Sequence, residues 1–213
     1  MTLIFPSILE NSFEELQRKA SMSEPYVERI QVDFCDGRFV PGKTVWVDEF
    51  KNLKFGKKVE AHLMIEEPLE WVADFAKRAD IILFHLEATD KPFAVIDAIH
   101  KCGKKAGIVI NTETPAAEVF PFLDQVAQVQ VMSVVPGKQG QPFIEGSVDK
   151  VREIRENSRD IPIEVDGHMD PETAPKVVRA GATIVCPGSF AFRTGNVKDA
   201  IEAIRKAIET QHG

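Results

Sequence analysis

Cysteine is scarce in this chain: 213 residues contain Cys35, Cys102 and Cys186, which are too few and too widely spaced for a disulfide framework or a CxxC metal site. We therefore expect a protein of the reducing cytoplasm. Long apolar runs are absent as well, and none approaches the roughly 20 residues that a membrane span needs. The first apolar segment has no basic region before it, so we expect no secretory signal.

Positive charge is in deficit too. The chain has 26 Lys and Arg residues against 33 Asp and Glu, a formal net charge of -7 at pH 7, which disfavours nucleic acid and anionic membrane surfaces as partners. An anionic metabolite is not excluded, because backbone N–H groups can bind an anion locally. A composition of 44% hydrophobic and 28% charged residues is typical of a soluble protein, and we expect one domain over residues 1–213.

Segments typical of strands and helices alternate along the whole chain. The expected strands are short and almost continuously apolar, as buried parallel strands are, and they lie at residues 3–8, 27–33, 58–64, 81–85, 106–110, 129–135, 161–165 and 183–186. Helices are expected at residues 12–22, from Pro68 onward, and at 94–101, 116–123, 148–157, 171–180 and 197–210. This order predicts an α/β fold of the (β/α)8 or TIM barrel type, with a doubly wound open sheet as the alternative.

In a parallel barrel, the active site lies at the carboxyl ends of the strands. Polar and sulfur-containing side chains gather there, together with glycines: Ser7, Gln31, Asp33, His62, Met64, His85, Glu87, Asn111, Met132, Ser133, Asp166, Gly167, Gly188 and Ser189. Core filling does not require so many polar groups on one rim. Residues two apart in a strand share one face, so Gln31 lies on the face of Asp33. His85 has no matching acid in this pattern, and we assign it a structural or supporting role.

Asp33, His62 and Asp166 are expected to converge on the barrel axis. Two carboxylates and an imidazole suit a divalent metal, and carboxylates on opposite sides of a substrate suit paired proton transfer. Each residue also has a simpler interpretation. Asp33 can accept N–H bonds in the turn that follows it, Asp166 with Gly167 forms a common turn pair, and a strand-end histidine is more often structural. Because all of them fall on one rim, a shared site is favoured.

The segment 131–144, VMSVVPGKQGQPFI, predicts a strand that ends in a glycine-containing loop before a helix near Glu145. Gly137 and Gly140 allow the backbone to approach a ligand closely and to present N–H groups to an anion. Most Pro-Gly loops are only turns, so this loop alone is a weak indication of a phosphate site. Gly188 and Ser189 can either cap the next helix or offer N–H groups to a phosphate.

Eight segments in order along the chain resemble the ribulose-phosphate 3-epimerase family of phosphate-binding TIM barrels. They are PSIL at 6–9, VDFCDGRFVPG at 32–42, AHLMIEEP at 61–68, HLEA at 85–88, GIVINTETP at 107–115, VMSVVPGKQGQPFI at 131–144, EVDG at 164–167 and GATIVCPGS at 181–189. The resemblance implies inversion of C3 between D-ribulose 5-phosphate and D-xylulose 5-phosphate through an enediolate, with one divalent metal (Zn, Fe, Mn, Co or Mg). It also implies a homo-oligomer.

The resemblance implies a role for each residue. Asp33 and Asp166 become the acid/base pair, and they ligate the metal together with His62. The residues expected to contact the phosphorylated sugar are Ser7, His62, Met64, Met132, Gly137, Lys138, Gln139, Gly140, Gly167, His168, Gly188 and Ser189.

The sequence departs from the family pattern at residues expected to bind the metal ion and at residues expected to bind the phosphate group. Gln31 stands where the family usually has a metal-binding histidine, and Cys35 replaces a methionine. Lys138 and Gln139 lie in the phosphate loop where the family has Phe-Gly, and His168 replaces a glycine. Two other functions therefore stay open: an epimerase of another ketose phosphate, such as a ketohexose 6-phosphate, and a sugar-phosphate-binding barrel that has lost catalysis.

Overall fold

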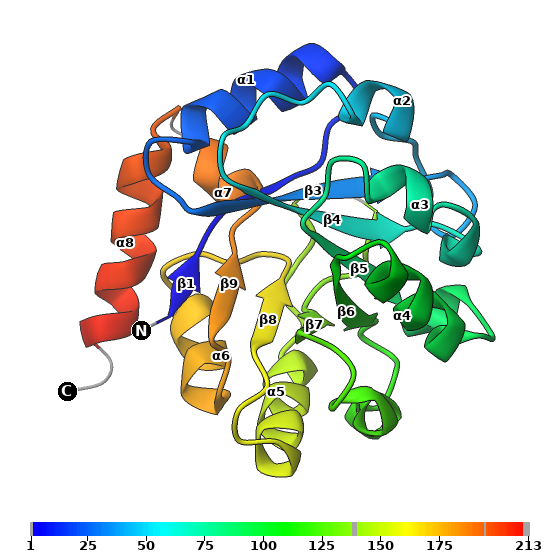
Figure 1. Cartoon of the computed structure of the whole chain (residues 1–213). Coiled ribbons are helices and arrows are strands. Elements are labelled where there is room, and N and C mark those ends of the chain that lie inside the picture. Colours follow the sequence, from blue (N-terminus) through cyan, green and yellow to red (C-terminus); the bar gives the residue numbers. More distant parts are fainter. Residues whose placement is uncertain (1, 138–139, 194, 211–213) are drawn as a thin grey trace.

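The computed structural model describes residues 2–137, 140–193 and 195–210 (Figure 1). All strands pair in parallel in one sheet, in the order β1-β9-β8-β7-β6-β5-β4-β3-β2. The strands are β1 (Leu3–Ile4), β2 (Ser7–Ile8), β3 (Arg29–Cys35), β4 (Lys58–Met64), β5 (Ile81–His85), β6 (Lys105–Ile110), β7 (Gln128–Met132), β8 (Ile163–Asp166) and β9 (Ile184–Cys186).

The N-terminal segment closes this sheet into a barrel. β1 pairs with β9, and β2 pairs with β3 on the other side. The expected strand 3–8 is therefore divided at Phe5 and Pro6, because Pro6 has no N–H to extend the ladder toward β3. The carbonyl of Pro6 still accepts a hydrogen bond from the N–H of Gln31 at 3.0 Å. With β1 and β2 counted as one strand, the molecule is the predicted (β/α)8 TIM barrel.

Helices cover the outer side of the strands (Figure 1). They are α1 (Phe13–Ser23), α2 (Val47–Phe50), α3 (Val72–Phe75), α4 (Pro92–Lys101), α5 (Gly146–Asn157), α6 (Ala174–Ala180), α7 (Ser189–Phe192) and α8 (Val197–Thr210), with 3-10 turns η1 (Pro68–Glu70), η2 (Leu86–Ala88) and η3 (Ala116–Phe122). The helix expected at 116–123 is a 3-10 helix over Ala116–Phe122, with Pro121 inside it. α2 has only four residues, too few for a helical periodicity to show in the sequence.

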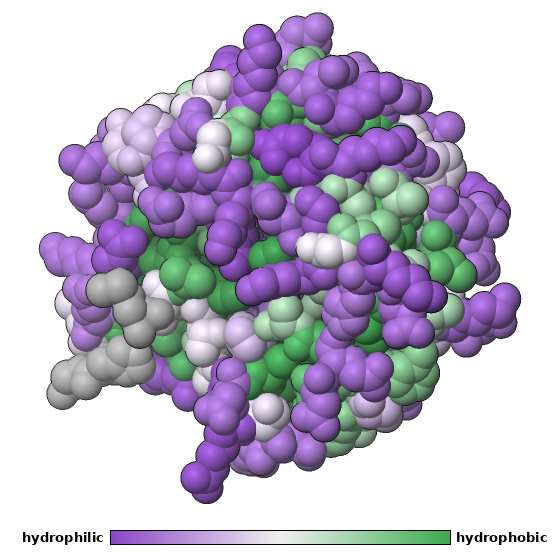
Figure 2. Space-filling model, viewed as in Figure 1, coloured by the Kyte–Doolittle hydropathy of each residue, from purple (hydrophilic) through white to green (hydrophobic). Residues whose placement is uncertain are grey.

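The surface in the orientation of Figure 1 is mainly hydrophilic, with apolar side chains in scattered groups (Figure 2). Within the described ranges, the helices are all too short or too polar to cross a bilayer.

The interior of the barrel carries a buried polar cluster below its carboxyl-terminal rim. Arg29 Nη1 donates to Glu60 Oε2 at 2.9 Å and to Gln128 Oε1 at 3.0 Å, and Gln128 Nε2 donates to both Glu60 and Glu164. Burial raises the pKa of Glu60, although the charge of Arg29 opposes this effect. The pKa of Glu164 lies well above its usual range, because of burial first and of repulsion from Glu60 second. One arginine therefore faces two buried carboxyl groups, and burial favours the protonated form of Glu164.

Replacing Glu164 by glutamine is expected to stabilise the fold at neutral pH. The pKa of the Glu164 carboxyl is higher in the folded than in the unfolded chain. Such a group stabilises the fold fully at a pH below 4.5, its ordinary pKa, and this stabilisation is lost as the pH rises through the folded-state pKa. Glutamine has no charge to bury, and its N–H group can donate to the unpartnered buried Glu60 Oε1. We expect a Tm increase of roughly 2–8 °C at pH 7.5 that shrinks toward pH 4.5, measured by calorimetry.

Glu60→Gln is the matched control, because it removes the carboxylate that pairs with Arg29 at 2.9 Å. This variant should lower the Tm, since it leaves the half-buried Arg29 guanidinium without its counter-charge. A loss of Tm in Glu164→Gln as large as in Glu60→Gln would show that Glu164 is ionised in the folded protein.

Candidate active site

Asp33, His62 and Asp166 meet at the rim, as the sequence predicts. β3 and β4 pair in register with Asp33 opposite His62, and Asp166 is the last residue of β8. One potential ligand atom from each residue lies within 4.8 Å of the others, and all three side chains are buried. His62 Nδ1 is 2.9 Å from Asp33 Oδ1 and 3.7 Å from Asp166 Oδ2. These three side chains could hold a metal ion.

Gln31 reaches the centre of this cluster. Its Nε2 lies 2.8 Å from Asp33 Oδ1, 2.9 Å from Asp166 Oδ2 and 3.2 Å from His62 Nδ1, so the amide N–H groups bridge the two carboxylates. The other amide atom, Oε1, is buried and has no hydrogen-bond partner among the described residues. A half-turn of the amide exchanges the two atoms and presents an oxygen to the cluster. Three oxygens and one imidazole nitrogen then form a donor set that fits a divalent cation.

The two aspartates differ in their surroundings. Burial, followed by the charge of Asp33, raises the pKa of Asp166 to about 7, although hydrogen bonds from Gln31 and Ser7 favour its ionised form. The Ser7 Oγ donates to Asp166 Oδ1 at 3.2 Å. Burial opposes protonation of His62, but its hydrogen bond with Asp33 and the charges of both aspartates raise its pKa overall. Asp166 therefore accepts a proton more readily than an exposed aspartate does.

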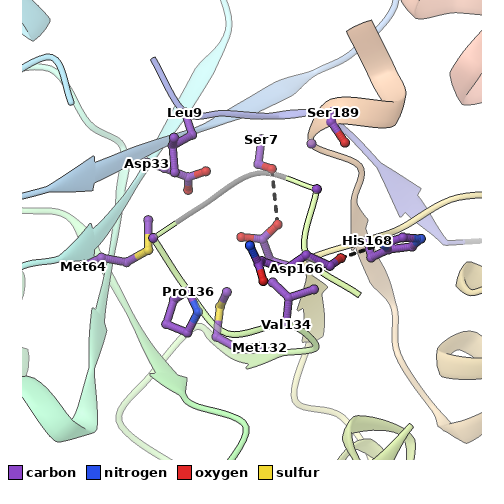
Figure 3. A pocket seen from close by; sticks show the side chains of 15 residues that line it. Ser7, Leu9, Asp33, Met64, Met132, Val134, Pro136, Asp166, His168 and Ser189 are labelled. Carbon is purple, nitrogen blue, oxygen red and sulfur yellow. Dashed lines mark hydrogen bonds between the residues drawn. The ribbon is translucent and has the colours of Figure 1, made fainter. Parts of the chain in front are cut away.

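A cavity of about 60 Å³ lies over the two aspartates. Figure 3 shows Asp33 and Asp166 directed into it, with Met64 and Met132 on the side away from Ser189. Its lining residues are Ser7, Leu9, Asp33, Met64, Met132, Val134, Pro136, Gly137, Gly140, Gln141, Asp166, Gly167, His168, Gly188 and Ser189. Of the expected site residues, Gln31 and His62 lie among the buried side chains beneath it and do not line it. Lys138 and Gln139 lie outside the described residues.

Glycines form part of the cavity wall. Gly167 has a φ of +107°, and a Cβ there would lie 2.6 Å from Val134 Cγ2. Gly137 has a φ of +94°, and a Cβ there would lie 2.8 Å from Val40 Cβ. Side chains are therefore excluded at both positions, and the backbone itself forms the wall, as a site for an anion requires.

His168 has a left-handed backbone, with a φ of +49°, a conformation that favours glycine. Its Nδ1 lies 2.7 Å from the carbonyl oxygen of Gln141, and its Nε2 lies 3.8 Å from Asp170 Oδ2. The ring also lines a second cavity of about 90 Å³, which shares Gly140, Gly188 and Ser189 with the first. His168 thus lies at the wall of the site, with its ring held by the carbonyl of Gln141.

Comparison with known proteins agrees with this geometry. The model of the ribulose-phosphate 3-epimerase family matches residues 3–192. The chain belongs to this family. It is 35% identical to ribulose-phosphate 3-epimerase of Bacillus subtilis (strain 168) over 96% of this chain and 99% of the relative. It is 38% identical to the enzyme of the same name from Synechocystis sp. (strain ATCC 27184 / PCC 6803 / Kazusa), over 96% and 94% respectively.

The fold is shared more widely than the family. A solved structure of 3-hexulose-6-phosphate synthase superposes with a TM-score of 0.74 at 19% identity, covering 98% of this chain and all of that one. At this identity the likeness concerns the barrel alone.

Several cavity residues were missed by sequence reasoning. Leu9, Val134 and Pro136 are apolar and Gln141 follows the glycine loop, so none stood out as a polar strand end. Their only signal was their place inside the family-like segments. The sequence pattern offered no acid for His85, but Glu87 Oε2 lies 3.4 Å from its Nδ1, without a hydrogen bond at that nitrogen.

Two other predicted rim residues do not line the main cavity among the described residues. Ser133 is buried and donates through its hydroxyl to the carbonyl oxygens of Asp166 and Gly167, at 3.0 and 2.5 Å. It therefore fixes the turn after β8. The N–H of Asn111 donates to Glu87 Oε1 at 2.8 Å, on the side of β6.

Proposed function

We propose that this protein is a ketose-phosphate 3-epimerase, an isomerase that interconverts D-ribulose 5-phosphate and D-xylulose 5-phosphate. Family membership over residues 3–192 supports the reaction. The observation that carries the mechanism is the pair of buried carboxyls, Asp33 and Asp166, that face one cavity and share hydrogen bonds from the same Gln31 amide.

The two carboxyls act on opposite faces of C3. One carboxylate takes the C3 proton and the electron pair moves into the carbonyl group, which gives an enediolate. The other carboxyl, protonated beforehand, gives its proton to the opposite face of C3, and the configuration inverts. Asp166 suits the protonated role near neutral pH, because its pKa is raised to about 7. The aspartates exchange roles in the reverse direction.

A divalent cation would be held by Asp33, His62 and Asp166, with Gln31 Oε1 as the fourth donor. It supplies positive charge for the two oxygens of the enediolate. The oxygen-rich donor set favours Mn, Fe, Co or Mg over Zn, which prefers nitrogen and sulfur donors. Met64 and Met132 give the cavity weakly polar walls that limit the access of water to the intermediate.

The phosphate group would lie against the glycine wall. Gly137, Gly140, Gly167 and Gly188 line the cavity and can offer backbone N–H groups, and the Ser189 hydroxyl adds a further donor. His168 also lines this cavity. A cytoplasmic location and a homo-oligomeric state stay predictions from the sequence.

The test is exchange of the C3 hydrogen. In D2O with Mn²⁺, purified protein should incorporate one deuterium at C3 of D-ribulose 5-phosphate and produce D-xylulose 5-phosphate, both followed by proton NMR. Faster turnover of a ketohexose 6-phosphate than of D-ribulose 5-phosphate would identify the ketohexose 6-phosphate as the substrate. Tight sugar-phosphate binding without exchange, with Mn²⁺, Fe²⁺, Co²⁺, Mg²⁺ and Zn²⁺ each supplied, would contradict the enzyme and favour a binding barrel.

A further inference from the structure

The imidazole ring of His168 lies where two cavities adjoin. The main cavity above the aspartates and the second cavity of about 90 Å³ have four lining residues in common, Gly140, His168, Gly188 and Ser189. Two of these four residues are glycines, and the Ser189 side chain ends one atom beyond its Cβ. Among the residues that the structure describes, His168 therefore has the only large side chain that borders both cavities.

The two ring nitrogens of His168 face different cavities. Nδ1 lies 2.7 Å from the carbonyl oxygen of Gln141, which lines the main cavity but not the second. Nε2 lies 3.8 Å from Oδ2 of Asp170, which lines the second cavity but not the main one. Figure 3 shows His168 beside Asp166, on the side away from Met64. The ring thus extends from the wall of one cavity to the wall of the other and separates them.

The position of this ring is fixed by its neighbours. A carbonyl oxygen can only accept a hydrogen bond, so Nδ1 donates to Gln141 and the ring plane is held. The carbonyl oxygen of His168 accepts a hydrogen bond from Thr173 Oγ1 at 2.5 Å, which holds the backbone. A residue with a Cβ rarely adopts a φ of +49°. Such strained residues persist where the surrounding contacts enforce them, and they gather at binding sites.

We propose that His168 sets the length of the phosphorylated sugar that the site accepts. This role rests on the proposed function, because it takes the ligand to be a ketose phosphate with C3 above Asp33 and Asp166. The phosphate group of a five-carbon sugar then lies on the near side of the ring, against Gly167 and Ser189. One further carbon moves the phosphate group by about 1.5 Å toward the ring, and the fixed imidazole excludes it.

The second cavity gives room for a longer sugar once the ring is removed. Arg193 lines this cavity, and its exposed guanidinium lies 5.9 Å from the centre of the Phe190 ring. A guanidinium binds a phosphate group strongly. The carboxylate of Asp170 opposes such binding, but its Oδ1 accepts the backbone N–H groups of Glu172 and Thr173, at 2.8 and 3.0 Å, which offset part of its charge. The enlarged site would therefore suit a ketohexose 6-phosphate.

His168→Gly tests this role, because it removes the ring and glycine adopts a φ of +49° without strain. The matched control is Glu67→Gly, since Glu67 has nearly the same φ, +48°, and lines neither cavity. The ligands are D-ribitol 5-phosphate and D-allitol 6-phosphate, which is one CHOH group longer. Both are sugar alcohols without a carbonyl group, so neither can react. Calorimetry in the presence of Mn²⁺ measures the two Kd values for each protein.

Wild type and Glu67→Gly should bind the ribitol phosphate roughly 10–100-fold more tightly than the allitol phosphate. His168→Gly should reduce this preference by about tenfold or more, alone or combined with Asp170→Asn, which removes the opposing charge. A wild type without this preference, an unchanged preference in both folded His168 variants, or an equal loss in Glu67→Gly would overturn the proposal.

The same measurements separate this role from the proposed function. The expected binding preferences in a protein that does not epimerise D-ribulose 5-phosphate would refute only the proposed function. Epimerisation of D-ribulose 5-phosphate by wild type, together with an unchanged preference in both His168 variants, would refute only the role of His168.

Discussion

Replacement of Asp166 by asparagine is expected to lower kcat by roughly 10³-fold, because an amide can neither take nor give the C3 proton. The fold should persist. Ser7 Oγ can still donate to the side-chain oxygen, and the unpartnered Oε1 of Gln31 can turn to accept from the new N–H group. Asp33→Asn should have an effect of similar size. Both are measured as steady-state rates in the two directions, with circular dichroism to confirm folding.

Isotope exchange separates the two aspartates. If each carboxyl serves one face of C3, Asp33→Asn should still exchange the C3 hydrogen of one epimer with D2O, and Asp166→Asn only that of the other epimer. Neither variant should convert one epimer into the other at more than a trace. The control is Asp97→Asn, an exposed residue of α4, which should leave all rates unchanged. Near-normal turnover in either active-site variant, or exchange of the same epimer by both, would contradict the assignment.

The barrel was predictable because its strands are buried on both faces. Apolar runs such as residues 81–85 need no partner to be recognised, and β5 has these bounds. The division of the first strand was less visible, because it depends on Pro6 facing β3 and not β9. α7 was also missed as an element, since Ser189–Phe192 is too short to show a helical period.

The convergence of Asp33, His62 and Asp166 was predictable for a related reason. Parallel strands end on the same side, and a period of two places residues of one face on the barrel axis. The orientation of the Gln31 amide was not predictable, because it depends on three neighbours from three different strands. The proximity of Glu87 to His85 was hidden in another way, since Glu87 lies beyond the strand, in η2, where side-chain direction no longer follows the alternation.

Glu60 and Glu164 show the limit of reasoning from strand ends. Both lie within apolar strands, where a lone acid has no visible function. Only the closed barrel brings them to Arg29 and Gln128, across four strands. The interior thus contains two polar layers. The lower layer, which includes Glu60 and Glu164, holds charged groups but does not line the cavity above Asp33 and Asp166.

Gln31→His should raise the affinity for Zn²⁺ by roughly 10–100-fold, and that for Mn²⁺ by less, because imidazole nitrogen is a better donor for zinc than an amide oxygen. The substitution also removes the amide N–H groups that bridge Asp33 and Asp166 and must turn away before a cation can bind. Calorimetric titration of the metal-free protein measures both affinities. The epimerisation rate with Zn²⁺ should rise in parallel.

Gln130→His is the matched control for this substitution. Gln130 is another fully buried glutamine whose Nε2 lies 3.4 Å from His62 Nδ1, but among the described residues no hydrogen bond joins its side chain to either aspartate. A histidine there should not raise the affinity for zinc. Equal affinities in wild type and Gln31→His would place residue 31 outside the set of metal ligands. Such a result would leave Asp33, His62 and Asp166 as the only protein donors that the described part of the cluster offers.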